Sequence, residues 1–191
     1  MKKRILILMV LMIVGMAFVE KSNAAEPKRG GTLTFAVATT PPTLDWHINA
    51  ARAVALYAGM YIWESLTAVD EKLVPQPMLA DSWKVSKDGL EWTFILRKGV
   101  YFHNGKEMTS EDVVASLKRW REVSPRADLF DRVKEIVATD RYTATFKLNA
   151  PMATLPYILA QEGCQPIIHP KEIIQGAAPN KLPAYVGTGP Y

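Results

Sequence analysis

The sequence contains few of the residues that build catalytic or metal sites. Among its 191 residues it has one cysteine, Cys164, so no disulfide can form within the chain. Its three histidines, His47, His103 and His169, are more than 50 residues apart, whereas a structural metal site needs about four ligands, usually at short spacing. A Cys164–His169 hydrolase would need a third group to position the base, and nothing in the sequence marks one. We therefore expect no metal, no cofactor and no enzymatic activity.

Nucleotide and nucleic-acid binding are also poorly supported. No Walker-type G-K-[ST] motif occurs, and Gly187-Thr188-Gly189 lacks the further glycine and the helix of a dinucleotide fingerprint. The formal net charge of +4 is concentrated in the first 24 residues, which carry +3, and the remainder carries only +1. Such a balanced body offers no basic surface for a phosphate backbone, so we expect no nucleic-acid partner.

The first 24 residues have the three parts of an export signal. Lys2-Lys3-Arg4 is followed by 15 residues without a polar side chain, from Ile5 to Val19, and then by Ser22-Asn23-Ala24 as a cleavage site. Fifteen helical residues span ~22 Å, less than the ~30 Å of a bilayer core, which favours a cleaved signal over an uncleaved anchor. With no cysteine at the cleavage site for a lipid anchor, we expect a periplasmic protein.

Polarity patterns along the rest of the chain predict a mixed α/β protein. Alternation predicts strands at 32–37, 79–85, 90–97, 133–137 and 142–148. Helices are expected at 49–66, from Thr109 to about Ser124, at 151–159 (with Pro156 as an obstacle) and at 171–175. Thr109 and Asp112 have the spacing of a capping box, and Lys118, Arg119 and Arg121 would complement the dipole at the other end of that helix. Position on the alternating faces predicts a core location for Trp83, Trp92 and Trp120.

Two turns punctuate this pattern. Asp88-Gly89 separates the strands 79–85 and 90–97 and predicts a hairpin, because glycine accepts a positive φ without steric cost. Asn104-Gly105 predicts a second turn before the helix that begins near Thr109. Pro75 and Pro77 are expected to interrupt regular structure, since proline has no amide hydrogen.

Three consecutive segments, 79–83, 88–105 and 108–119, resemble the signature of the bacterial family 5 extracellular solute-binding proteins, the receptors for oligopeptides, dipeptides and nickel. Further landmarks in the same order agree with this resemblance: Gly30-Gly31-Thr32-Leu33, Thr43-Leu44-Asp45, Trp63-Glu64-Ser65-Leu66, the strand 140–148 and Gly187-Thr188-Gly189-Pro190-Tyr191. The resemblance extends over the whole chain after the signal.

The resemblance implies a periplasmic-binding-protein-like fold of two lobes, with an extra domain inserted in the first lobe. Residues 1–24 would be the signal peptide, 25–62 the start of lobe I, 63–178 the inserted domain and 179–191 the return to lobe I. The second lobe would follow and is absent, so only the N-terminal part of the fold is expected. The signature lies in the inserted domain and identifies the family without marking the ligand pocket.

In function, the resemblance implies a monomeric receptor that captures peptides or similar small solutes for an inner-membrane ABC permease. In peptide-binding relatives the stretch after Leu44-Asp45 forms one wall of the cleft. The candidate ligand-binding residues are therefore Trp46, His47, Asn49 and Arg52, and the last two have side chains that can bond a solute's backbone or carboxylate. The alternative for these polar residues is an ordinary solvated loop. An exported enzyme or a ligand sensor, with its active part beyond residue 191, remains the alternative function.

Overall fold

The computed structural model describes residues 30–32, 34, 36, 40–49, 59–160, 165–178 and 181–191. The expected signal peptide, Arg52, Cys164 and much of the expected strand 32–37 lie outside these residues. Residues 37–191 form a compact unit separate from residues 1–36, and the fold below is that of this unit. None of its described helices is long and apolar enough to cross a membrane.

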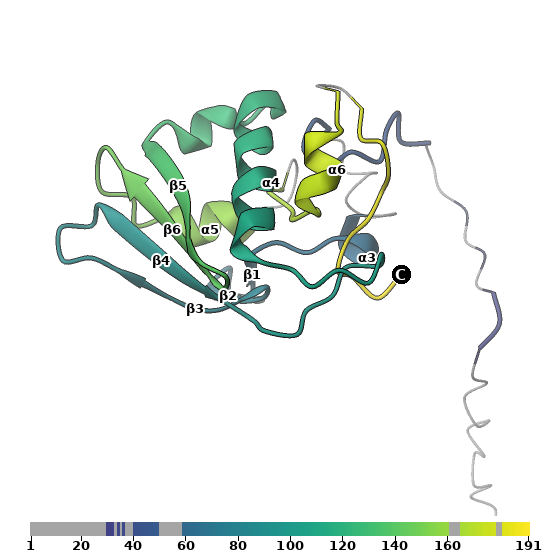
Figure 1. The fold of residues 1–191 in the computed structure, drawn as a ribbon, viewed down its shortest axis with the longest axis horizontal. Helices are drawn as coiled ribbons and strands as arrows, with labels where there is room; N and C mark the ends of the chain where they lie inside the picture. Colours follow the sequence, from purple (N-terminus) through teal and green to yellow (C-terminus); the bar gives the residue numbers. More distant parts are fainter. Residues whose placement is uncertain are drawn as a thin grey trace, which may run out of the picture. The chain divides into compact units, whose positions relative to one another are not determined.

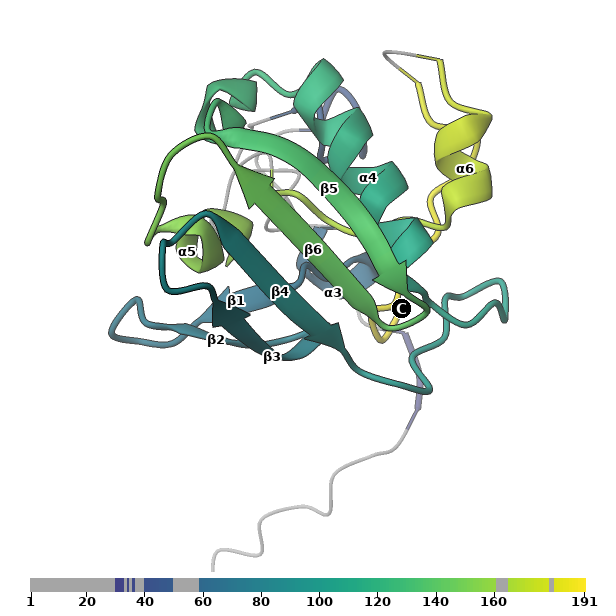
Figure 2. The same ribbon diagram turned by 60° about the vertical axis from the view of Figure 1, so that its left-hand side comes forward.

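The main sheet has four antiparallel strands in the order β3-β4-β6-β5. They are β3 (Ala80–Val85), β4 (Glu91–Leu96), β5 (Val133–Asp140) and β6 (Thr143–Leu148). Helix α4 (Ser110–Val123) lies across one face of the sheet over β5 and β6, as Figures 1 and 2 show. The hairpin predicted around Asp88-Gly89 is confirmed, and Gly89 has a φ of 71°.

The core lies between this sheet and α4. On β4 the residues Trp92, Phe94 and Leu96 are buried, whereas Glu91 and Ile95 are exposed, which is the alternation of a strand with one solvated face. From α4, Val113, Leu117 and Trp120 pack against them at i, i+4 and i+7. The core positions predicted for Trp92 and Trp120 are confirmed, and Trp83 is half-buried against the same cluster.

The N-terminus of α4 confirms the predicted capping box. The Thr109 amide donates to Asp112 Oδ2 at 2.8 Å, and the Thr109 side chain in turn accepts the amide hydrogen of Asp112. Two donors that an isolated helix end leaves unsatisfied are thereby paired. Asp112 also accepts hydrogen bonds from the Lys106 ammonium at 2.6 Å and the Lys171 amide at 2.8 Å. This one carboxylate therefore joins three segments.

Two predicted helices have different bounds from those expected. Of the helix expected at 49–66, residues 50–58 lie outside the described part of the chain. The described helix α3 spans Met60–Ile62 and Trp63 is already extended, so the helix ends four residues before Leu66. Helix α5 (Leu155–Ala160) begins later than residue 151, which places Pro156 in its first turn, where the missing amide hydrogen costs nothing. The short helix α6 (Lys171–Gln175) is confirmed, and a 3-10 turn, Ala127–Phe130, follows α4.

A small hairpin replaces the break expected at Pro75 and Pro77. Strand β1 (Thr67–Val69) pairs antiparallel with β2 (Pro75–Pro77) in a two-stranded sheet. Both strands of such a sheet are edges, so a proline can direct its missing donor away from the partner. The prediction of irregular structure was wrong here because proline is compatible with an edge strand.

The last residues of the chain lie against the end of α3. The Gly189 amide donates to the Ile62 carbonyl at 2.9 Å, and the Gly187 carbonyl accepts from the His103 amide at 2.9 Å. A β-carbon on Gly187 would lie 1.8 Å from the Ile62 carbonyl oxygen. Only glycine allows this approach of two backbone segments. The glycine-rich end of the sequence is thus explained by packing.

Candidate functional site

The loop that carries the predicted ligand residues is ordered first by its own side chains. The Asp45 amide donates to Thr43 Oγ1 at 3.1 Å, and the His47 amide donates to Asp45 Oδ1 at 3.1 Å. Threonine and aspartate commonly bond backbone amides two residues away in such turns. These bonds fix the course of the chain from Thr43 to His47.

A buried arginine of α4 then attaches this loop to the helix. Arg119 donates from Nη1 to Asp45 Oδ1 at 3.1 Å and from Nη2 to Asp45 Oδ2 at 2.5 Å, a two-point pairing across 74 residues of sequence. The Asp45 side chain is fully buried and Arg119 is 5 % exposed. A buried charge is tolerated when it is both paired and hydrogen-bonded, which is the case here.

Two buried histidines complete the cluster. His47 lies with Nδ1 at 3.1 Å from Arg119 Nη1 and with Nε2 at 2.9 Å from the Ile167 carbonyl oxygen. The His169 ring stands edge-on to His47, with the ring centroids 5.0 Å apart. The His169 backbone is fixed by Ser116 of α4, whose hydroxyl accepts from the His169 amide at 2.9 Å and donates to the His169 carbonyl at 3.2 Å.

Burial keeps both histidines neutral. It lowers the pKa of His47 to about 3, and the positive charge of Arg119 adds to this effect while the hydrogen bond to Ile167 opposes it. Burial is also the main reason that the pKa of His169 lies well below its usual value, followed by the neighbouring His47. Asp45 is the negative charge that acts in the opposite direction on His169. The Val186 carbonyl also acts to raise the pKa of His169, but among the described residues neither ring nitrogen has a hydrogen bond of normal geometry.

The four predicted ligand residues occupy different environments. Trp46 and His47 are buried, at 1 % and 0 % exposure, so both contact the protein interior in this chain. Asn49 is partly exposed at the end of the loop, and Arg52 lies outside the described residues. The ligand-binding role of all four residues stays a prediction, and the loop's attachment to α4 is what the structure adds.

A small pocket of about 150 Å³ lies beside Trp46. Trp63, Met60 and Met78 give it an apolar wall, and Glu64 and Gln165 add polar groups. Among the described residues, none is a hydrogen-bond partner of the buried indole Nε1 of Trp46. A Cβ on Gly59 would lie 2.4 Å from the Trp46 ring, so the close contact of α3 with this ring depends on a glycine.

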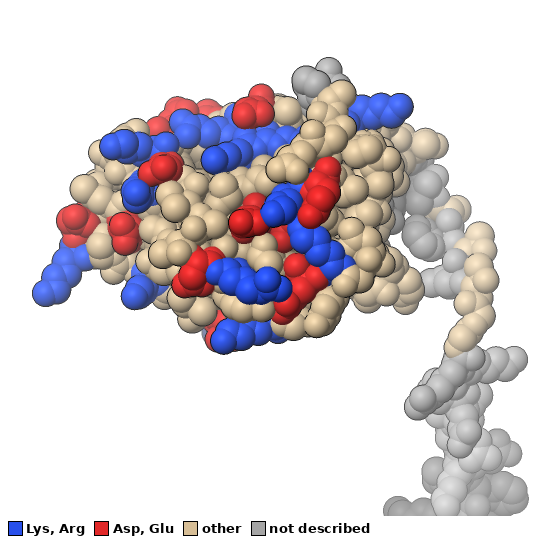
Figure 3. Space-filling model, in the orientation of Figure 1, with Lys and Arg blue, Asp and Glu red and all other residues tan. Residues whose placement is uncertain are grey.

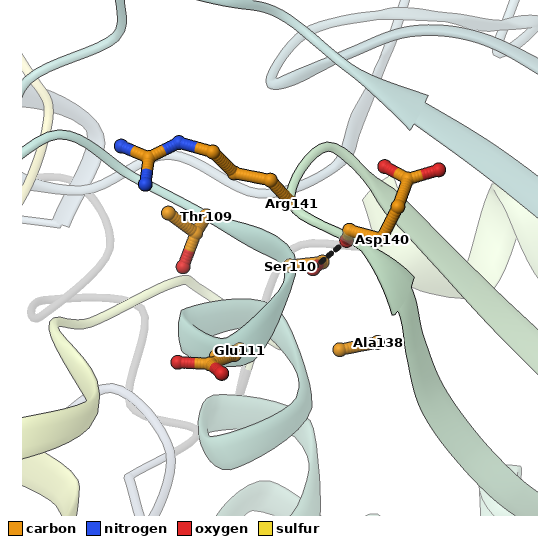
Figure 4. A pocket seen from close by; sticks show the side chains of 6 residues that line it. All are labelled: Thr109, Ser110, Glu111, Ala138, Asp140 and Arg141. Atoms are coloured by element: carbon orange, nitrogen blue, oxygen red, sulfur yellow. Dashed lines mark hydrogen bonds between the residues drawn. The ribbon is translucent and has the colours of Figure 1, made fainter.

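A second pocket lies where α4 begins, between Thr109, Ser110, Glu111, Ala138, Asp140 and Arg141 (Figure 4). Its polar groups already have protein partners: Ser110 Oγ donates to the Asp140 carbonyl, and Arg141 Nη2 donates to Glu107 at 2.8 Å. Glu111 likewise pairs with Lys171. With these groups engaged and the helix capped by Asp112, this pocket is a surface hollow without a ligand signal.

Charges of both signs lie close together on the described surface. On the face shown in Figure 3, acidic and basic side chains are interspersed. Several form pairs, such as Lys106 with Glu172 at 2.8 Å and Lys147 with Glu135 at 3.1 Å. Among the described residues, no group of three or more histidine, cysteine or acidic side chains is placed to hold a metal.

Sequence reasoning missed the partners of the loop. Arg119 was expected to complement the dipole at the end of α4, but it is buried and pairs with Asp45. His47 and His169 were separate histidines in the sequence, and the fold brings their rings together. No local pattern signals a contact between residues more than 70 positions apart. An arginine close to the buried stripe of α4 was the only available hint.

The described residues form part of the periplasmic-binding-protein fold, as the similarity to three solved structures shows. MoaA from A. tumefaciens R10, solved with mannopinic acid, has a TM-score of 0.70 and 26% identity, covering 78% of this chain and 31% of its own. AgaA from the same source, solved with agropinic acid, has a TM-score of 0.67 and 29% identity over 79% of this chain and 30% of its own. AppA from Bacillus subtilis, solved with a nonapeptide, has a TM-score of 0.64 and 25% identity over 75% of this chain and 30% of its own.

Within that class the family is clear. Residues 74–191 match the bacterial extracellular solute-binding proteins, family 5 (middle part), and the chain belongs to this family of ABC-importer binding proteins. A probable peptide ABC transporter periplasmic-binding protein of Sinorhizobium fredii, y4tO, is 36% identical over 70% of this chain and 25% of its own length. The HTH-type transcriptional regulator SgrR of Escherichia coli is 31% identical over 75% of this chain and 24% of its own. The chain thus spans about a quarter of the curated relatives that it matches.

Proposed function

We propose that this chain is the ligand-contacting beginning of a periplasmic receptor that captures peptides or similar small solutes and delivers them to an inner-membrane ABC permease. In this proposal residues 1–24 are the export signal and the receptor is a monomer without catalytic activity. Residues 25–62 and 179–191 would belong to lobe I, and residues 63–178 to the inserted domain. The ligands named for solved relatives, mannopinic acid, agropinic acid and a nonapeptide, define the range of ligands to test first.

The observation that carries the proposal is the attachment of the loop 43–49. Backbone amides that donate to the side chains of Thr43 and Asp45 shape it, and the buried Asp45–Arg119 pair fixes it to α4. A binding wall must keep its geometry before the ligand arrives, because ordering it during binding would reduce affinity. Asn49, at the partly exposed end of this loop, is then held in place for a polar contact. Arg52 follows as the candidate for a carboxylate.

Recovery of the protein from its own host gives the first test. Native mass spectrometry of the periplasmic protein should show a bound small solute that is lost on denaturation. That solute then serves in calorimetry with Asn49→Ala and Arg52→Ala, each expected to weaken binding about tenfold or more, since a hydrogen bond to a charged group contributes roughly 1.5–3 kcal/mol.

Arg97→Ala is the matched control for Arg52, because Arg97 is an exposed arginine at the end of β4. It should leave the affinity unchanged. Unchanged affinity in both Asn49→Ala and Arg52→Ala would contradict the assignment of this wall. Turnover of peptides by the purified protein, lost in Cys164→Ser, would replace the receptor with an enzyme.

A ligand sensor is the second candidate, because SgrR, a transcriptional regulator by name, matches three quarters of this chain. The two functions share a solute-binding step and differ in the partner. Co-purification with a membrane permease supports the receptor. Recovery from the cytoplasm in a DNA-bound complex would support the sensor instead.

A further inference from the structure

Four buried side chains form a cluster: Asp45, His47, Arg119 and His169. Three of them are cationic or can gain a proton, and one is a carboxylate that can balance a positive charge. Asp45 is the one carboxylate that the described residues contribute to it, and Arg119 already uses both oxygens of that carboxylate. The pair is neutral in sum. Each histidine that gains a proton therefore adds an uncompensated positive charge to a buried site, which is strongly unfavourable.

The hydrogen bonds of His47 fix its protonation state by geometry. A carbonyl oxygen can only accept, so the Nε2 atom that faces Ile167 at 2.9 Å carries the hydrogen. A guanidinium can only donate, so the Nδ1 atom that faces Arg119 at 3.1 Å must be the unprotonated acceptor. Protonation at Nδ1 would place two donors and two positive charges against each other, and the contact would be lost.

Burial outweighs the Val186 carbonyl, an acceptor near His169 that acts to raise its pKa. Among the described residues, neither buried ring nitrogen of His169 has a hydrogen bond of normal geometry, and the neighbouring rings are those of His47 and Trp63, the latter with centroids 5.7 Å apart. The charged groups that act on it are Arg119 of α4 and Asp45 of the loop. Its own segment contributes the Ile167 carbonyl to the cluster, and the C-terminal segment contributes the Val186 carbonyl.

We propose that Asp45, His47, Arg119 and His169 form an acid-sensitive latch, which holds the loop 43–49 against α4 at neutral pH and releases it in mild acid. The latch itself is a property of these four residues. Its consequence, weaker ligand binding in acid through a displaced Asn49, rests on the proposed function.

The pKa directions give the pH window. Both histidines have a pKa below 6.5 in the closed loop and regain about 6.5 once the loop opens. The open form therefore binds more protons, and closure is fully favoured above pH ~6.5 and weakens as the pH falls below it. Below pH ~6.5, each histidine raises the equilibrium constant for loop opening about tenfold for every unit by which the pH falls. From pH 7.5 to 5.0, one histidine therefore raises this constant roughly 30-fold, and the two together raise it roughly 1000-fold.

Hydrogen exchange followed by NMR measures this opening without any ligand. The probes are the amides of His47 and Ile48, which are bonded to Asp45 in the closed loop. Their protection factors should fall roughly 1000-fold between pH 7.5 and 5.0, whereas amides in the centres of β4 and β6 stay more protected than the loop at both values. Equal loss of protection in the loop and the sheet would mean unfolding of the whole domain and would overturn the latch.

Variants of the two histidines separate the latch from general acid effects. His169→Phe keeps a ring of similar size and should reduce the pH response of the loop to roughly 30-fold. His47→Gln/His169→Phe should abolish it. His103→Gln is the matched control, because His103 is an exposed histidine and its replacement should leave the roughly 1000-fold response intact. If His47→Gln prevents folding, His169→Phe alone decides: an unchanged response overturns the proposal.

The measurement also separates the latch from the proposed function. If the loop opens in acid while the solute affinity stays constant, the latch is supported. The same result argues against the proposal that this loop forms a wall of the ligand-binding cleft. A loop that stays closed at pH 5.0 overturns the latch and leaves the receptor proposal standing.

Discussion

Two regions of the molecule are stabilised in different ways: the sheet packed against α4, and the junction at which the loop 43–49 is attached to Arg119 of α4. In the first region, neighbours in sequence are neighbours in space: β3 follows into β4 through one turn, and α4 begins with a capping box from Thr109 to Asp112. In the junction, Asp45 pairs with Arg119 and His47 with Ile167, across 74 and 120 residues. The comparison shows that the family signature up to residue 118 lies in the locally specified region, whereas its last residue, Arg119, and the candidate ligand wall depend on distant partners.

The largest loss of unfolding free energy is expected when the buried Asp45–Arg119 pair is disrupted. Arg119→Ala leaves the Asp45 carboxylate buried without its cation, and removal of one partner of a buried pair costs about 3–5 kcal/mol of unfolding free energy. Chemical denaturation of the purified protein measures this loss. Asp45→Ala/Arg119→Ala should lose less than the sum of the two single variants, because no unpaired charge remains. Strict additivity would show that the pair is not the unit that stabilises the junction.

An intermediate effect is expected at the C-terminal segment. Gly187→Ala forces a methyl group against the Ile62 carbonyl, and overpacking of this kind costs about 1–3 kcal/mol. The backbone must shift, so the His103 amide, which donates to the Gly187 carbonyl, should also exchange faster with solvent. Gly99→Ala makes a contrasting control, since an added Cβ there meets no atom within 4 Å, although its φ of 69° adds local strain. A His103 amide as slow as in the parent protein would argue against close packing.

The smallest loss of unfolding free energy is expected at the N-terminus of α4, in the region whose structure local sequence signals specify. Thr109→Ala removes the side-chain half of the capping box and should lower the unfolding free energy by about 1 kcal/mol, the usual cost of losing an N-cap. Thr109→Ser retains a hydroxyl and should recover most of that loss. Thermal denaturation of the two variants gives the comparison. A loss in Thr109→Ala as large as that in Arg119→Ala would contradict the contrast between the two regions.

The sequence determined most of the first region because its signals are local. Alternation of polarity placed β3, β4 and β6 within a few residues of their observed bounds, and the spacing of Thr109 and Asp112 identified the start of α4. Errors arose where tertiary context overrides a local rule: Pro75 and Pro77 lie in an edge strand, and the helix before Trp63 gives way to the chain that enters β1. Membership of the solute-binding family followed from the same local signature.

Only the tertiary structure decided the environment of the candidate site. Arg119 carries a charge in a position that the sequence assigns equally well to a solvated helix end, and burial converts it into the anchor of a distant loop. His47 and His169 are ordinary histidines in sequence, and their neutral state results from desolvation and from donors and acceptors contributed by other segments. Local polarity patterns predict which face of a helix or strand is apolar. Which charges meet inside the protein depends on how the elements pack, and this is why the chemistry of the junction could not be read before the fold was known.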